Sequence, residues 1–285
     1  MASLLPLVRL LWRDARAGRL QRSLALTAGL TSGLSGLEVG YMHYRAGFGQ
    51  RVMWTPILAT NALAGAGLAA AVNPKLARSL LPAVAAVTLA DCATGFVYHL
   101  RGIARKPGGW RLLDPNVPMG PPPLAPLLLG ISAYLGILAA RMQPEFSQTD
   151  VPPQLRAQLH RHLALVTAVS ALCSGIEALY SHHRNNFRYT VQYTPVALAP
   201  VIAAAGIASA LRPRRARWFL PLASVAALLD GGVGFVYHAR GILRRPGGSH
   251  HLVYNLLYGP PVFAPLLFAA CGFFGLLASV LRGKA

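Results

Sequence analysis

The chain carries the stretch Asp91-Cys-Ala-Thr-Gly-Phe-Val-Tyr-His-Leu-Arg-Gly-Ile-Ala-Arg-Lys-Pro-Gly-Gly109. The same pattern returns 139 positions later, as Asp230-Gly-Gly-Val-Gly-Phe-Val-Tyr-His-Ala-Arg-Gly-Ile-Leu-Arg-Arg-Pro-Gly-Gly248. Thirteen of these nineteen residues are identical. The offset also aligns, without a gap, Gly36, Glu38, Tyr41, His43 and Arg45 with Gly175, Glu177, Tyr180, His182 and Arg184. Self-similarity at a fixed offset predicts a duplicated structural unit.

Composition predicts an all-α integral membrane protein. Apolar residues make up 54% of the 285 residues, while charged residues make up 12%. The uncharged runs are close to the length of about 20 residues that a helix needs to cross a bilayer. We expect eight transmembrane helices, at 23–44, 53–73, 79–100, 121–141, 162–183, 190–211, 218–239 and 261–281. They would form two tandem parallel four-helix repeats, related by a pseudo-twofold axis along the membrane normal.

The chain divides into four segments on this interpretation. Residues 1–22 form a basic amphipathic N-terminal segment, 23–141 the first repeat, 142–160 a polar linker and 161–282 the second repeat. The segments on the side of the termini hold more of the 27 Lys and Arg residues than the opposite loops do. The positive-inside rule then predicts cytoplasmic termini, in an inner or plasma membrane.

The net charge of +19 comes from residues that are spread over one loop after another between the apolar runs. This spread predicts attraction to a lipid bilayer and no binding of nucleic acid. The sequence has no Walker, Rossmann, Ser-His-Asp, Cys-x-x-Cys or Cys-x-x-Cys-His pattern. Their absence argues against nucleotide hydrolysis, soluble dehydrogenase chemistry and c-type haem attachment.

Four of the eight acidic residues lie inside the expected spans, at matched positions of the two repeats: Glu38, Asp91, Glu177 and Asp230. An ionised carboxylate at the centre of a membrane helix costs roughly 2.5–3.5 kcal/mol, so these groups need partners, protons or a function. We interpret them as candidate catalytic groups that relay protons. The alternative is that they form buried ion pairs with arginines and clamp helices together.

Four histidines, His43, His99, His182 and His238, end the first and third expected span of each repeat. Helical geometry places Glu38 and His43 on different faces, and Asp91 and His99 at different depths, which disfavours a compact metal centre of all four side chains. Two imidazoles at one depth instead resemble the axial ligands of haem b or of another metal. The predicted pairs are His43 with His99 and His182 with His238.

Further residues around each pair are candidates for binding the cofactor, arginines for example through haem propionates. They are Arg45, Arg101, Arg105, Arg184, Arg240, Arg244, Tyr98 and Tyr237. We expect the glycine faces of Gly36 and Gly40, and of Gly95 and Gly102, to leave room for a flat ring. A histidine at the end of a span is, however, often only an interfacial residue, and tyrosines occur there in aromatic belts.

The resulting hypothesis is a membrane-embedded redox or cofactor-binding subunit with a duplicated polar site in the outer half of the bilayer. It would pass electrons between a protein partner on the outer face and quinone. Two alternatives remain open. The chain could be a proton-coupled transporter, or a structural membrane subunit in which buried carboxylates only clamp helices.

Overall fold

A computed structural model of the chain describes residues 20–142 and 152–282, and these residues form helices and no strands. This confirms the predicted all-α membrane-type fold. Four long helices come before residue 143: α2 (Leu20–Arg45), α3 (Thr55–Val72), α4 (Pro74–Ala104) and α6 (Ala125–Arg141). Four more follow: α7 (Pro153–His183), α8 (Thr194–Leu211), α9 (Phe219–Leu243) and α11 (Ala264–Leu281).

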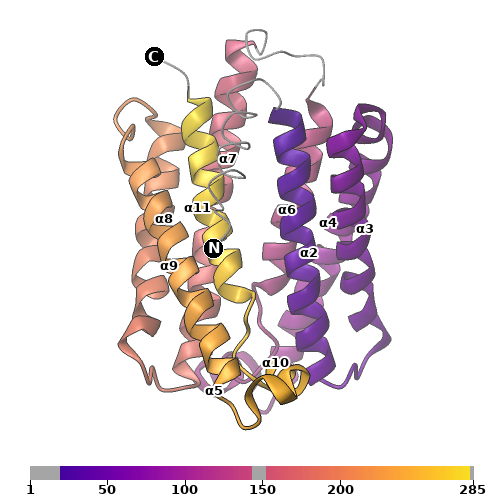
Figure 1. Cartoon of the computed structure of the whole chain (residues 1–285), viewed down its shortest axis with the longest axis vertical. Coiled ribbons are helices and arrows are strands. Elements are labelled where there is room, and N and C mark those ends of the chain that lie inside the picture. The colour runs from indigo at the N-terminus through magenta and orange to yellow at the C-terminus, as the bar shows by residue number, and fades with distance from the viewer. Residues whose placement is uncertain (1–19, 143–151, 283–285) are drawn as a thin grey trace.

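Short helices join the long ones at one end of the molecule, where Figure 1 shows α5 and α10. They are the 3₁₀ turns η1 (Arg51–Trp54), η2 (Gly109–Arg111), η3 (Thr190–Tyr193) and η4 (Gly248–His251), with α5 (Leu113–Asn116) and α10 (Leu252–Tyr258). The hydropathy pattern did not predict them, because a helix of one or two turns is too short to register in it. Helix α3 and turn η1 begin 139 residues before α8 and η3, the same offset as in the sequence.

Six helical segments of the described chain are long and apolar enough to cross a membrane. They are Arg51–Val72, Lys75–Ala104, Pro153–His183, Thr190–Leu211, Phe219–Leu243 and Ala264–Leu281. Helix α6 is apolar but has 17 residues. A fold compatible with an integral membrane protein is therefore established by these six segments.

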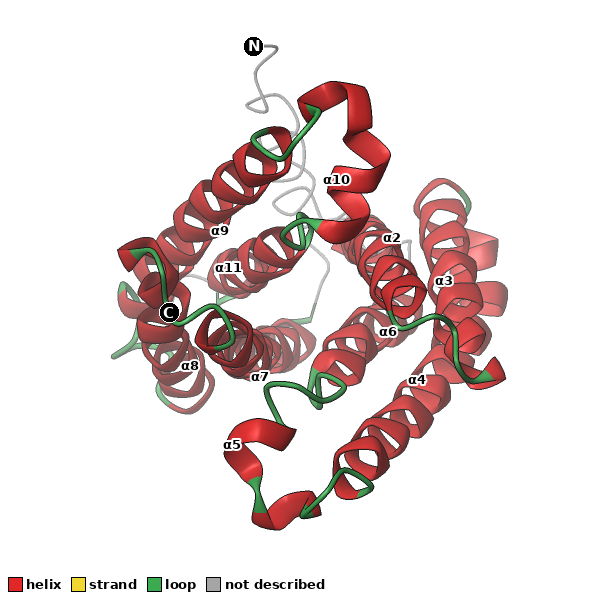
Figure 2. Ribbon diagram, turned by 90° about the horizontal axis from the view of Figure 1, so that it is seen from below, coloured by secondary structure: helices red, strands yellow, loops and turns green. Residues whose placement is uncertain are grey.

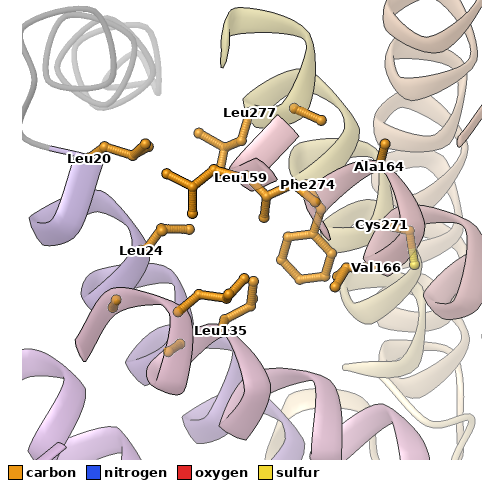
Figure 3. Packing of buried hydrophobic residues seen from close by; sticks show 14 of the residues in the cluster. Leu20, Leu24, Leu135, Leu159, Ala164, Val166, Cys271, Phe274 and Leu277 are labelled. Atoms are coloured by element: carbon orange, nitrogen blue, oxygen red, sulfur yellow. The ribbon is translucent and has the colours of Figure 1, made fainter. Parts of the chain in front are cut away.

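The long helices pack as two groups of four, seen end-on in Figure 2. Helices α2, α3, α4 and α6 contact one another in a ring, as do α7, α8, α9 and α11. The groups meet along α2, α6, α7 and α11. One cluster of buried apolar side chains extends across this junction and includes Leu24, Leu135, Leu159, Phe274 and Leu277 (Figure 3). The two groups consequently share a core.

Small residues bring the first two helices of each group into backbone contact. A Cβ atom on Gly67 of α3 would lie 2.8 Å from the Cα atom of Gly29 on α2. A Cβ atom on Gly206 of α8 would lie 2.5 Å from the carbonyl oxygen of Ala164 on α7. Close approach through small residues is the usual way in which membrane helices gain packing energy.

Helix α7 begins at Pro153, earlier than the sequence analysis expected, so residues 153–160 of the expected linker are helical. Proline suits the first turn of a helix. The first turns of α7 are held because Leu159 and His160 are buried, at 3% and 4% exposure. Residues 1–19 of the expected N-terminal segment and residues 143–151 of the expected linker lie outside the described residues.

Candidate functional site

The repeated motif folds into a rigid turn after α4 and again after α9. Asn116 donates from Nδ2 to the carbonyl oxygens of Pro107 and Gly109, at 2.9 and 2.8 Å. In the second copy, Asn255 donates to the carbonyl oxygens of Pro246 and Gly248, at 3.1 and 3.0 Å. Each buried amide thus ties together the two ends of a Pro-Gly-Gly turn.

Glycine is required in this turn for its backbone conformation. Gly108 and Gly247 have φ angles of 76° and 78°, in the left-handed region that glycine adopts without steric cost. A part of the sequence identity between the two copies therefore reflects folding of the turn.

The glycine faces that the sequence suggested for a flat ring are occupied by protein. A Cβ atom on Gly36 would lie 2.5 Å from Oγ1 of Thr60, and one on Gly102 would lie 2.8 Å from Cγ of Pro121. Gly95 faces Pro126. The expectation of open space is wrong at these three positions, because neighbouring elements use the missing side chains for close packing.

Two of the predicted carboxylates connect the two groups of helices. Glu177 on α7 accepts, through Oε1, a 2.7 Å hydrogen bond from the backbone N–H of Leu124, the N-cap of α6. Glu38 on α2 accepts a hydrogen bond from the backbone N–H of Phe263, the N-cap of α11. Each carboxylate therefore caps the last helix of the other group, where unpaired N–H groups and the helix dipole favour a negative charge.

Tyr41 and Arg45 extend the contact made by Glu38. The hydroxyl of Tyr41 donates to the carbonyl oxygen of Gly259 at 3.0 Å, and Nη1 of Arg45 donates to that hydroxyl at 2.8 Å. Oε2 of Glu38 is buried and has no hydrogen-bond partner. Oε2 of Glu38 is therefore left without a partner, while Tyr41 on the same helix is held by its hydrogen bonds.

The other two carboxylates lie within their own groups. Oγ1 of Thr55 on α3 donates to Oδ1 of Asp91 on α4 at 2.5 Å. The side chain of Thr194 on α8 bonds Asp230 on α9 in the same way. Asp91 and Asp230 thus link the second and third helix of each group, while Glu38 and Glu177 link the groups. The four predicted catalytic carboxylates fall into two separate kinds of contact.

Three of the four predicted histidines have an anchored imidazole. Nδ1 of His43 lies 2.7 Å from the carbonyl oxygen of Met53. Nδ1 of His99 and of His238 each lie 2.6 Å from a carbonyl oxygen, of Pro122 and Pro261 respectively. A carbonyl oxygen can only accept, so Nδ1 carries the proton of each neutral ring and the lone pair is on Nε2. This anchoring through the other nitrogen is typical of metal-binding histidines.

The structure brings the predicted histidine pairs together. The ring centroids of His182 and His238 are 6.5 Å apart, and the ring planes are 88° apart. His43 lies within electrostatic range of His99. In the described parts of the chain, no group of three or more His, Cys, Asp or Glu side chains could hold a metal ion. Among the described residues, each predicted pair therefore consists of two imidazoles without a third His, Cys, Asp or Glu side chain beside them.

An aromatic pair that sequence reasoning missed flanks each histidine pair. Phe48 stacks on Trp54 with ring centroids 4.1 Å apart, and Phe187 stacks on Tyr193 at 4.3 Å. Both phenylalanines have left-handed backbones, with φ angles of 46° and 45°. Such a conformation costs about 1–3 kcal/mol in a residue other than glycine. Only the matched spacing of aromatic residues in the two copies could have indicated these pairs.

The remaining predicted cofactor-binding side chains point outward. The side chains of Arg101, Arg105, Arg184, Arg240, Arg244, Tyr98 and Tyr237 are exposed. Arg101 follows His99 by two residues, which turns it about 160° away from His99 around α4. Arg45 contacts Tyr41 instead of a carboxylate. Most of the arginines are therefore exposed on the outside of the molecule, whereas the histidines are partly buried.

A groove of about 600 Å³ lies beside the second turn. It is lined by Tyr44, Ser249, His250, His251, Leu252, Val253, Tyr254, Leu257 and Tyr258. At the first turn, the positions equivalent to Tyr44 and Val253 are His183, from the second half, and Asp114, and Nε2 of His183 lies 3.3 Å from Oδ1 of Asp114. The two halves thus differ here: the second turn borders the groove, and the first turn has the contact between His183 and Asp114 instead.

Comparison of the chain with models of protein families, with curated proteins and with solved structures finds no match.

Proposed function

We propose that the chain is an integral membrane protein of eight transmembrane helices, with α2 and α6 as spans besides the six segments that are long and apolar enough to cross a membrane. Both helices pack within the groups of four to which those six belong, which supports this count. The halves would be parallel repeats about a pseudo-twofold axis along the membrane normal. The N- and C-termini would be cytoplasmic, and the end that carries α5 and α10 would face outward.

The proposed role of the protein is that of a redox subunit that binds a metal cofactor at each histidine pair. The observation that carries this proposal is the anchored Nδ1 of His43, His99 and His238, which leaves Nε2 available as a ligand. Each nitrogen lies roughly 1.1 Å from its ring centroid, so two imidazoles bound at about 2.0–2.1 Å to opposite sides of one metal have centroids about 6.3 Å apart. The 6.5 Å separation of His182 and His238 is close to this value.

Haem b is the cofactor that needs only two protein ligands, because its macrocycle supplies the other four nitrogens. The absence of a third donor in the described residues argues against a bare metal ion with protein ligands alone. The packed glycines Gly36, Gly95 and Gly102 argue against a large ring beside them. The absorption spectrum separates these two classes of centre, because only a haem gives the porphyrin absorption band.

In this role the protein would exchange electrons between a protein partner on the outer face and quinone. A reduced quinone takes up protons, and a carboxyl group with an oxygen that has no other partner can supply one. Oε2 of Glu38 meets that requirement, since it is buried without a partner. Glu38 is therefore the carboxylate that we propose as the proton donor.

The test is an absorption spectrum and a metal analysis of the protein extracted from membranes in a mild detergent. We expect bound metal, found by metal analysis and, for a haem, by its absorption band, and we expect the amount to be reduced in His99→Ala and in His238→Ala. His183→Ala is the matched control, since it removes an imidazole at the same end that belongs to neither pair. A colourless, metal-free wild-type protein would contradict the redox proposal.

A second candidate is a structural membrane subunit. It is favoured by the bonds from Glu38 and Glu177 to the N-caps of α11 and α6, which hold the two groups of helices together without any cofactor. A protein with no bound metal, whose stability falls sharply on removal of either carboxylate, would support this function.

A further inference from the structure

Four exposed arginines of the repeated motif have no contact that explains them. Arg101 and Arg105 on the last turns of α4 and its C-cap, and Arg240 and Arg244 at the matched places of α9, are exposed. None of the four guanidinium groups has a hydrogen bond or an ion pair with another described residue. Their identity in both copies therefore does not follow from contacts among the described residues.

The neighbouring residues of the motif are explained by packing. Gly102 meets Pro121, and Gly241 meets Pro260. Ile103 is fully buried, at 0% exposure. These contacts fix the backbone of the turn but do not involve the arginine head groups. Packing thus explains why the motif contains the glycines and the isoleucine, but it does not explain the arginines.

The helix dipole alone is not a sufficient reason for these arginines. A cation near the C-terminus of a helix interacts favourably with the helix dipole, but a lysine would serve there as well as an arginine. Each helix here carries two arginines, one turn apart. They lie about 40° apart around the helix, so both head groups face the same side.

The turns that follow the arginines in sequence also expose apolar side chains. In the first copy, Trp110, Leu112 and Leu113 are 43%, 51% and 56% exposed. In the second copy, Val253 and Tyr254 are 72% and 58% exposed. Apolar and aromatic side chains beside basic residues, at the ends of membrane-spanning helices, are typical of a surface that lies in the headgroup region of a bilayer.

We propose that each turn binds the phosphate group of an anionic phospholipid, through Arg101 and Arg105 in the first copy and Arg240 and Arg244 in the second. Guanidinium groups bind phosphate oxygens with two parallel hydrogen bonds, which makes arginine the better choice over lysine. The apolar side chains enter the acyl region beside the bound headgroup. These two lipid sites are independent of the histidine pairs and do not need a metal.

The experiment uses the full chain in a neutral detergent and counts bound lipid by native mass spectrometry. Phosphatidylglycerol is the probe, and phosphatidylcholine, which has no net charge, is the comparison. We expect two retained phosphatidylglycerol molecules. Arg101→Gln with Arg105→Gln should remove one of them, and the quadruple variant that also carries Arg240→Gln and Arg244→Gln should remove both. At about fivefold for each arginine, the affinity of one site falls about 25-fold in a double variant.

The matched control is the double variant Arg51→Gln and Arg188→Gln, which removes two exposed charges at the same end but outside the turns. It should retain both lipids. Equal retention by the wild type and the quadruple variant, or an equal loss in the control, would overturn the proposal. So would competition by inorganic phosphate that removes the lipid completely, because the site would then bind a soluble phosphate.

Discussion

Glu177 on α7 accepts a 2.7 Å hydrogen bond from the backbone N–H of Leu124, the residue that caps the N-terminus of α6. Glu38 makes the reciprocal contact with Phe263 ahead of α11. The first long helix of each group thus caps the last helix of the other group. This exchange joins the groups at the end where the histidine pairs lie.

Removal of the Glu177 carboxylate should destabilise the protein. In Glu177→Ala, the buried N–H of Leu124 loses its acceptor, and an unsatisfied buried donor costs about 1–3 kcal/mol. Glu177→Gln keeps an acceptor oxygen and should lose less. The measurement is the thermal unfolding midpoint in detergent. If alanine and glutamine variants both unfold at the wild-type temperature, the carboxylate does not clamp the helices.

Gly102→Ala should be destabilising, because the added Cβ atom would lie 2.8 Å from Cγ of Pro121. Overpacking of this kind costs about 1–3 kcal/mol. Gly232→Ala on α9 is the matched control, since no atom lies within 4 Å of its Cβ position. Alanine is also the better helix former there, by about 1 kcal/mol. The unfolding midpoint should be highest for Gly232→Ala, intermediate for the wild type and lowest for Gly102→Ala. The reverse order would contradict the packing described for the motif.

Asn116→Asp should open the turn after α4. The amide of Asn116 donates to two carbonyl oxygens, whereas an ionised carboxylate would place negative oxygens against them. We expect a loss of about 2–3 kcal/mol, the cost of an unpaired buried polar group. The measurement is the rate of limited proteolysis within residues 101–113, which should rise when the turn opens. Asn185→Asp, on an exposed side chain, should leave the cleavage rate unchanged, and protection of the turn in Asn116→Asp would show that the amide is dispensable.

The proposed topology predicts which side of the membrane each connection occupies. Cysteines introduced by Asn186→Cys and His250→Cys should react with an impermeant thiol reagent added to intact cells. Lys75→Cys and Arg214→Cys should react only after permeabilisation. The unmodified chain is the control, since Cys92, Cys173 and Cys271 are all buried. Labelling of all four variants from one side would rule out alternate crossing of the bilayer.

The histidine pairs show how far reasoning from sequence reached. The matched places of His43, His99, His182 and His238 at span ends predicted two ligand pairs, which stays a prediction; the structure places the rings of His182 and His238 6.5 Å apart. The acceptors of their Nδ1 atoms were not predictable. The carbonyl oxygens of Met53, Pro122 and Pro261 belong to connections whose path depends on how neighbouring helices pack.

The sequence by itself determined the helical membrane-type fold and the duplication, because hydropathy and repetition are properties of local stretches of chain. Tertiary structure alone decided the roles of the carboxylates and the glycines. Glu38 accepts a hydrogen bond from the backbone N–H of Phe263, which lies across the junction and more than 200 residues away in sequence. Pro121 packs against Gly102, in the space that a side chain there would occupy. A buried carboxylate can relay a proton, pair with an arginine or cap a helix. Which of these it does depends on the groups that the packed helices place beside it, and no single stretch of sequence contains that information.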